Sequence, residues 1–475
     1  LDLWKRWTKC AGRCGFANRI GLRNDCRGNV IDQYKELASN IVEFGKRLGA
    51  YQVSTSLVNA VSFQVEVRDG KIESLKESGS AGMYVTLCKD QQRSTISSND
   101  LRLETLRPLM RSAMQSLPFM GKDPFYSLPD PKLQGRADVT LEFSDPDFPI
   151  HQSEQKVEMA IELEEKTLAL ESSLRSEQAY YSDLVSHTVH ADSNGFLDGY
   201  SKTLYSVGIS VVTEDKATSG LNTGRKQTDG WFSSARFWEK LESLESIADK
   251  ACQRTLRKLG AIKPPTCEVP VVFSAEMARS FLASCSSAMM GDHVFRKQSF
   301  LMDKLGELVA NPQIQLSDQP LLSGMLGSRY FDSEGVIAKP LTLIEDGKLV
   351  NYMLSTYAGN KLKMESTGHA GGISNLVLEP GKYTEEELIS SVDNGLYLTS
   401  MSGQGVNVTT GDYSRGAQGL WIREGKLAEP VSEFTIASTF QQMLHNLDLI
   451  GCEVDTRNPI LTPPFRINKM SISGT

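Results

Sequence analysis

Residues 62–72 read Ser-Phe-Gln-Val-Glu-Val-Arg-Asp-Gly-Lys-Ile, and apolar and polar side chains alternate in this stretch up to the Asp69-Gly70 pair. Alternation with a period of two is typical of a β-strand that buries one face, and an Asp-Gly pair favours a tight hairpin turn. The stretch therefore predicts a β-hairpin, with a second strand that starts near Ile72.

The chain before this hairpin has a different period. Apolar residues recur there at intervals of four, three and four, at Leu37, Ile41, Phe44 and Leu48. This spacing places them on one face of a helix that ends at Gly49. The first part of the chain therefore predicts a helix packed against strands.

Further along, residues 117–149 contain six prolines and few apolar repeats, which indicates a linker or a long surface excursion. Beyond it we expect two helices and two strands, in the order helix 153–174, strands 179–191 and 200–212, and a helix at about 234–259. The Lys263-Pro264-Pro265 stretch then marks the clearest boundary in the chain.

After this boundary the pattern becomes that of short strands with glycine turns, following one helix at 275–290. We therefore expect an α+β protein, with an N-terminal α/β sandwich-like domain followed by a β-rich, barrel-like C-terminal domain. The expected units are a disordered or artefactual extension, an N-terminal α+β domain that could divide into two subdomains near 118–150, and the β-rich domain: 1–30, 31–262 and 266–475.

Composition restricts the class of protein. The net charge of -7 argues against a nucleic-acid partner, because phosphate binding needs clustered Lys and Arg. No run of apolar residues is long enough to span a bilayer, so we expect no membrane association. The eight cysteines follow no disulfide framework and form no CxxC pair, which indicates reduced thiols and a cytoplasmic protein.

No catalytic constellation is visible from residue types and spacing alone. The six histidines include no pair at the i, i+4 spacing of a zinc hydrolase, and His187 and His190 would point to opposite faces of a strand. There is no nucleophile elbow and no complete phosphate-binding loop. On the residues alone the function stays open.

A C-terminal run supplies a resemblance. Gly405-Val406-Asn407, the block Thr410-Gly-Asp-Tyr-Ser-Arg-Gly-Ala417 and Gly419-Leu-Trp-Ile422 together resemble the signature of the TldE (PmbA) proteins, a family once called modulators of DNA gyrase. Upstream agreement, which includes Phe331-Asp-Ser-Glu-Gly335, extends the resemblance over about residues 34–474.

The resemblance implies a cytosolic heterodimeric metallopeptidase that acts on unfolded peptides, in which a TldD-type partner carries an HExxxH zinc motif. At the matching positions this chain has Ala275 and Ser280 in place of the two histidines, and only Glu276 remains. We therefore expect no zinc in this chain, zinc in the partner, and no catalysis by this chain alone. Cys452 lies near the position of the partner's third ligand, and we expect it to be a buried structural thiol.

The resemblance also implies a cavity shared by the two subunits, in which a peptide is added as an extended strand to a sheet. Asp412, Tyr413, Ser414 and Arg415 are expected near that cavity or the interface. The alternative is that they form only a structural turn, with Asp412 accepting backbone hydrogen bonds. Two other functions stay open, a non-catalytic binding protein for DNA gyrase or a toxin–antitoxin component, and a self-sufficient homodimer.

Overall fold

The computed structural model describes residues 30–215 and 224–474. The expectation for an extension at residues 1–30 falls almost wholly outside this part, since only Val30 is described and it opens a helix. None of the described helices combines the length and the apolar character that crossing a bilayer requires.

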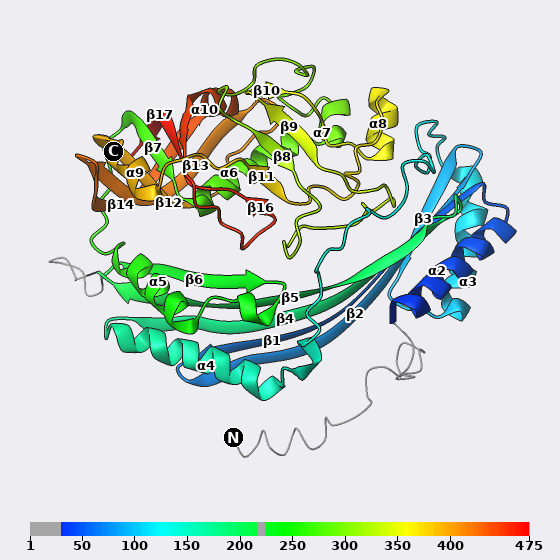
Figure 1. The fold of residues 1–475 in the computed structure, drawn as a ribbon, viewed down its shortest axis with the longest axis horizontal. Coiled ribbons are helices and arrows are strands. Elements are labelled where there is room, and N and C mark those ends of the chain that lie inside the picture. Colours follow the sequence, from blue (N-terminus) through cyan, green and yellow to red (C-terminus); the bar gives the residue numbers. More distant parts are fainter. Residues whose placement is uncertain (1–29, 216–223, 475) are drawn as a thin grey trace.

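One long, curved sheet forms the N-terminal domain (Figure 1). Its six strands are antiparallel and lie in the order β3-β2-β1-β4-β5-β6. The predicted hairpin is its first part, because Arg68 pairs with Lys71 across the turn. The strands are β1 Gln52–Arg68, β2 Lys71–Lys89, β3 Gln92–Ser98, β4 Arg175–Asp192, β5 Leu197–Glu214 and β6 Lys226–Ala235.

Four helices cover the outer face of this sheet in two separate pairs (Figure 1). One pair packs on a core that includes Leu57, and the other on a core that includes Tyr181. The pairs are α2 Val30–Arg47 with α3 Leu103–Ser116, and α4 Ser153–Leu170 with α5 Leu244–Leu256. The predicted α/β sandwich-like layer is confirmed.

The predicted apolar face of α2 packs on the core, with Ile41 buried and Leu37, Phe44 and Leu48 half-buried against it. Ala38 and Gly45 are buried on the same helix. A Cβ at Gly45 would come within 2.8 Å of Val53, so glycine allows the helix to lie close to the sheet. The helix predicted at about 234–259 is wrong at its start, since the sequence up to Ala235 continues strand β6 and α5 begins only at Leu244.

The C-terminal domain is built on a closed barrel. Its strands follow the order β14-β13-β12-β7-β17, and pairing between β14 and β17 closes the ring. The predicted barrel-like domain is therefore confirmed. The strands are β7 Cys267–Phe273, β12 Asn394–Ser402, β13 Asp412–Arg423, β14 Lys426–Thr439 and β17 Phe465–Ser473, with β15 Leu447–Ile450 added at the β17 side.

A second, smaller sheet and five helices complete this domain. The small strands are β8 Leu316–Asp318, β9 Leu341–Glu345, β10 Lys348–Leu349, β11 Leu376–Leu378 and β16 Ile460–Leu461. The helices are α6 Ala275–Ala288, α7 Gly291–Phe295, α8 Thr356–Leu362, α9 Glu385–Ser390 and α10 Phe440–Asn446. Helix α6 supplies Phe281 to the main core, where it meets Phe273 and Phe465.

The proline-rich segment 117–149 is mostly exposed, but part of it packs between the two domains. Leu141 and Phe143 are buried, and they form a small core with Tyr330 of the C-terminal domain. The hydroxyl of Tyr330 also donates to the Leu141 carbonyl oxygen, at 3.3 Å. Most of the segment is thus an exposed excursion, as expected, whereas Leu141 and Phe143 fill part of the boundary between the domains.

Candidate functional site

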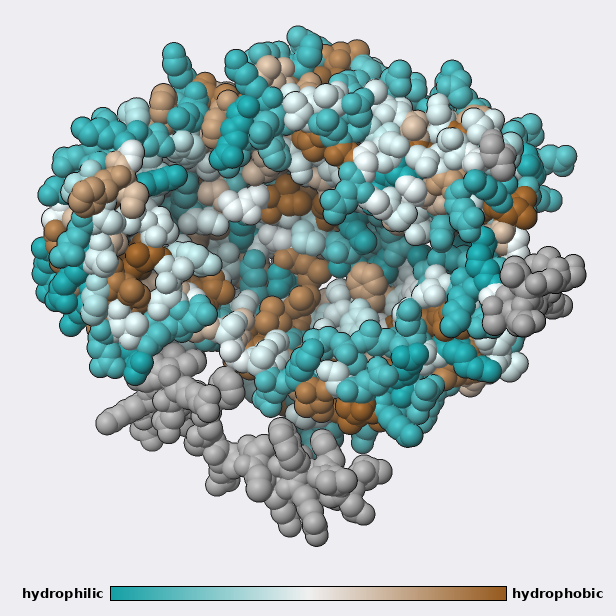
Figure 2. Space-filling model, turned by 180° about the vertical axis from the view of Figure 1, so that it is seen from behind, coloured by the Kyte–Doolittle hydropathy of each residue, from teal (hydrophilic) through white to brown (hydrophobic). Residues whose placement is uncertain are grey.

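The curved sheet and the C-terminal domain leave a hollow between them, which the space-filling view shows from behind (Figure 2). Two cavities lie along this boundary, and Thr456 lines both of them. Strand β6, an edge strand of its sheet, also borders both cavities. Trp231 lines the smaller cavity, and Ser234 lines the larger one.

We call the smaller one the α6 cavity; its volume is about 540 Å³, and Ala275 and Glu276 line it at the first turn of helix α6. The helix is held in place by its apolar face, on which Ala278, Phe281 and Leu282 are buried. A carboxylate at the N-terminus of a helix is favoured by the helix dipole, which suits Glu276.

Two guanidinium groups hold Glu276. Arg254 of helix α5 lies 2.7 Å from one carboxylate oxygen, and Arg457 of the loop before β16 lies 3.4 Å from the other. Arg254 also pairs with Asp229 at 3.2 Å, and Arg457 pairs with Asp455 at 2.9 Å. Because Arg254 and Asp229 belong to the N-terminal domain, this network joins the two domains.

The electrostatics of the network favour the charged forms. Burial raises the pKa of Asp455, but hydrogen bonds and charge from Arg457 outweigh it and hold this pKa below its ordinary value. Burial lowers the pKa of Arg254, but the charges of Glu276 and Asp229 outweigh it and raise this pKa above its ordinary value. These groups are therefore ionised and paired at neutral pH.

A third guanidinium reaches helix α6 from the barrel. Arg415 on strand β13 donates to the Ser280 hydroxyl at 3.0 Å. Of the four residues predicted near a cleft, Arg415 and Tyr413 contact this helix, and the Tyr413 ring does so edge-on against Phe281. Tyr413 is buried in the main core, where burial raises its pKa to about 12, while Asp412 and Ser414 are exposed on the opposite face of the strand.

The alternative of a structural turn also finds support. The Asp412 carboxylate accepts from the Thr410 hydroxyl at 2.5 Å, and the Asn407 backbone amide donates to the Asp412 carbonyl oxygen at 2.9 Å. Arg415 thus contacts helix α6 without lining either cavity, whereas Asp412 belongs to a turn. The donor to the Asp412 carboxylate is the Thr410 hydroxyl and not a backbone amide, which was the expected donor.

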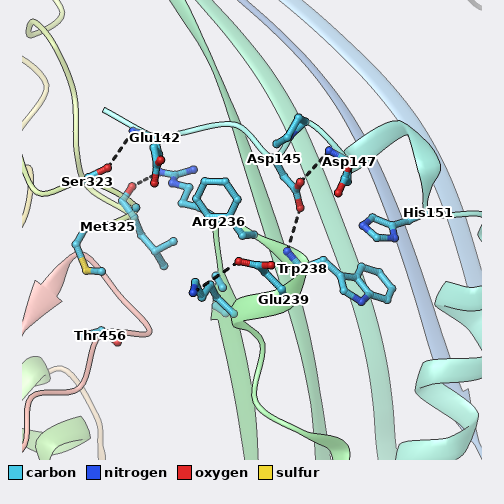
Figure 3. Close-up of a pocket in the computed structure, with 17 residues that line it drawn as sticks. Glu142, Asp145, Asp147, His151, Arg236, Trp238, Glu239, Ser323, Met325 and Thr456 are labelled. Atoms are coloured by element: carbon cyan, nitrogen blue, oxygen red, sulfur yellow. Dashed lines mark hydrogen bonds and ion pairs between the residues drawn. The ribbon is translucent and has the colours of Figure 1, made fainter. Parts of the chain in front are cut away.

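We call the larger one the acidic cavity; its volume is about 800 Å³ (Figure 3). Its charged lining residues are Glu142, Asp145, Asp147, Arg236, Glu239 and Lys240. The His151 ring stacks on Trp238 with centroids 4.1 Å apart and forms part of the wall. The Asp145 carboxylate accepts from the Trp238 backbone amide at 3.1 Å, and this bond joins the segment of Asp145 to the segment of Trp238.

Comparison with known proteins identifies the family. Models of the three domains of PmbA/TldA metallopeptidases match residues 54–117, 146–259 and 266–474. The metalloprotease PmbA of Escherichia coli O157:H7 is 31% identical over 465 residues, which cover 97% of this chain and 99% of that protein. This chain belongs to the PmbA/TldD family.

Solved structures agree with this assignment to the PmbA/TldD family. A protein of Bacteroides thetaiotaomicron, named as a modulator of DNA gyrase, matches with a TM-score of 0.88 and 26% identity over 94% of this chain and all of that one. TldE of Thermococcus kodakarensis, at 19% identity, has the same fold, with a TM-score of 0.81 over 92% of this chain and all of that one.

The PmbA/TldD family name implies a metal, but the residues at helix α6 do not fit one. Ala275 offers no donor atom, the Glu276 carboxylate is bound by two guanidinium groups, and the Ser280 hydroxyl accepts from a third. Across residues 30–215 and 224–474, no group of three His, Cys, Asp or Glu side chains is arranged to hold a metal ion. Cys452 is exposed, so the expected buried thiol is wrong.

Sequence reasoning missed two arginines and a tryptophan that line the α6 cavity. Arg254, Arg457 and Trp231 come from three segments with no shared motif, and the Arg457 guanidinium lies 3.7 Å from the Trp231 ring centroid. Only the fold brings them together, although the Glu276 carboxylate at the start of a helix with a buried apolar face could have prompted a search for its partners.

Proposed function

We propose that this chain is the zinc-less, TldE-type subunit of a cytoplasmic heterodimeric metallopeptidase that degrades or processes unfolded peptides. A TldD-type partner carries the zinc ion and the chemical step. The proposal is supported by Ala275 and Ser280, which stand where the resemblance places the two histidines of a zinc-bearing subunit, and by Glu276, which Arg254 and Arg457 engage.

The role of this chain in the pair is to hold the peptide. Strand β6 is an edge strand that borders both cavities. The Thr228 and Phe232 carbonyl oxygens already accept from Lys258 and Arg457, so an extended peptide would pair with the backbone of β6 near Ser234. Pairing through the main chain explains an action on many unfolded sequences, because main-chain groups are common to all of them. The described cysteines are free thiols, which supports a reducing compartment.

Co-production with a TldD-type chain tests this function. We expect a stable complex that cleaves an unfolded peptide, while each chain alone leaves it intact. Chelation of zinc is expected to abolish the cleavage, and added zinc to restore it. Cleavage by this chain alone, or a failure of the two chains to associate, would contradict the proposal.

A second candidate is a non-catalytic protein that binds DNA gyrase or a toxin–antitoxin component. The names of two solved relatives as modulators of DNA gyrase favour it. The same preparation separates the two functions, because association with gyrase in the absence of any peptide cleavage by the pair supports the second candidate over the first.

A further inference from the structure

The acidic cavity carries more negative than positive charge. Four carboxylates line it, against the two cations Arg236 and Lys240. Arg236 forms no ion pair with these carboxylates, and its guanidinium donates to the carbonyl oxygens of Thr203 and Leu326. Lys240 lies 3.6 Å from Glu239, its neighbour in the chain. The remaining lining acids therefore form no ion pair with either cation.

Those acids are Glu142, Asp145 and Asp147, and none of them forms an ion pair with any residue that the structure describes. Asp145 is 7% exposed, and its carboxylate already accepts hydrogen bonds from the Tyr205 hydroxyl, at 3.0 Å, and from the Trp238 backbone amide. Glu142 and Asp147 are exposed at the cavity, and their carboxylates have room for an incoming donor.

The wall beside these carboxylates is aromatic. Trp238 lines the cavity with its indole stacked against His151, at an interplanar angle of 15°. A flat aromatic wall attracts both the methylene groups and the charge of a lysine or arginine side chain. Figure 3 shows Trp238 and His151 on one side of the cavity and Glu142 on the other.

We propose that the acidic cavity binds a lysine or arginine side chain of an extended peptide. This inference rests on the proposed function, because it takes the peptide to lie along strand β6. A volume of about 800 Å³ has ample room for one long side chain and its neighbours. The peptide chain that pairs with β6 near Ser234 passes the mouth of the cavity, since Ser234 lines it.

The test measures binding of short fluorescent peptides that differ only in one central residue, arginine, glutamine or glutamate, to the purified chain alone. We expect the arginine peptide to bind about tenfold more tightly than the glutamine peptide, with the glutamate peptide weakest. Raising the salt to about 0.5 M should remove most of this preference, because it screens exposed charges.

Variants locate the effect. The double change Glu142→Gln with Asp147→Asn should abolish the preference for arginine, while Lys240→Gln should strengthen it. Glu158→Gln, an exposed carboxylate on helix α4 outside the cavity, should leave it unchanged. All of these side chains are exposed, so their loss does not disturb the fold. Equal binding of the three peptides, or a preference that survives the double change, overturns the inference.

The outcome is separable from that of the proposed function. Cleavage by the heterodimer without any preference for basic peptides in binding overturns this inference and leaves the proposed function standing. A salt-sensitive preference for arginine in this chain, in a pair that does not cleave, supports the inference and contradicts the proposed function.

Discussion

The α6 cavity and the acidic cavity share the lining residue Thr456, yet carboxylates that line them differ in whether they form ion pairs. In the α6 cavity Glu276 and Asp455 each lie against a guanidinium, and the pair of Glu276 with Arg254 crosses the domain boundary. In the acidic cavity Glu142 and Asp147 face open space. Paired charges hold the two domains together, whereas unpaired charges stay available to a ligand.

The largest expected effect comes from Glu276→Ala. It leaves Arg254 and Arg457 without their shared carboxylate, although Asp229 and Asp455 remain. We expect a loss of about 2 kcal/mol in the free energy of unfolding, less than for a buried charge left with no partner at all. Urea unfolding of the purified chain measures it.

The matched control is Glu453→Ala, an exposed carboxylate that lines the same cavity. Its loss should change the free energy of unfolding by less than about 0.5 kcal/mol. Equal effects of the two changes would show that the ion pairs of Glu276 do not join the domains.

A smaller contrast is expected inside the acidic cavity. Asp145→Asn weakens the acceptor of the Tyr205 hydroxyl and the Trp238 amide, and should cost about 1 kcal/mol of unfolding free energy. Glu142→Gln should change it by less than about 0.5 kcal/mol, because the side chain is exposed. A large loss from Glu142→Gln would mean that this carboxylate is structural.

A half-buried acid away from both cavities gives a pH dependence. Burial, with the charge of Asp332, raises the pKa of Glu334 from 4.5 to about 7. A folded pKa above the unfolded one means that its contribution to stability is complete below about pH 4.5 and is lost as the pH rises through about 7. Glu334→Gln should flatten this decline in thermal unfolding profiles, while the exposed Glu365→Gln should not.

Local patterns in the sequence predicted local structure well. The alternation around Phe63 and the Asp69-Gly70 turn gave the first hairpin, and the glycine turns after Pro265 gave the barrel. Ser234 was placed in a helix because the polar residues at the end of β6 show no clear period. Whether an edge strand is present depends on the neighbouring strand, which is not visible in the local sequence.

The site was predictable only in part. The resemblance placed Ala275, Glu276 and Ser280 on helix α6, where the structure has them. Arg254 and Arg457 could not be found in this way, because they are about 200 residues apart and only the docking of the two domains brings them to Glu276. The packing of Leu141 and Phe143 against Tyr330 was missed for the same reason.

Metal analysis of the purified chain tests the central claim most directly. Helix α6 carries Ala275 and Ser280 where the zinc-bearing partner is expected to have histidines, and arginines occupy the remaining donors. The account predicts that the chain alone, incubated with zinc and then dialysed, retains far less than one zinc ion per chain, while its complex with a TldD-type partner retains one. About one tightly held zinc ion per chain in the absence of a partner would contradict it.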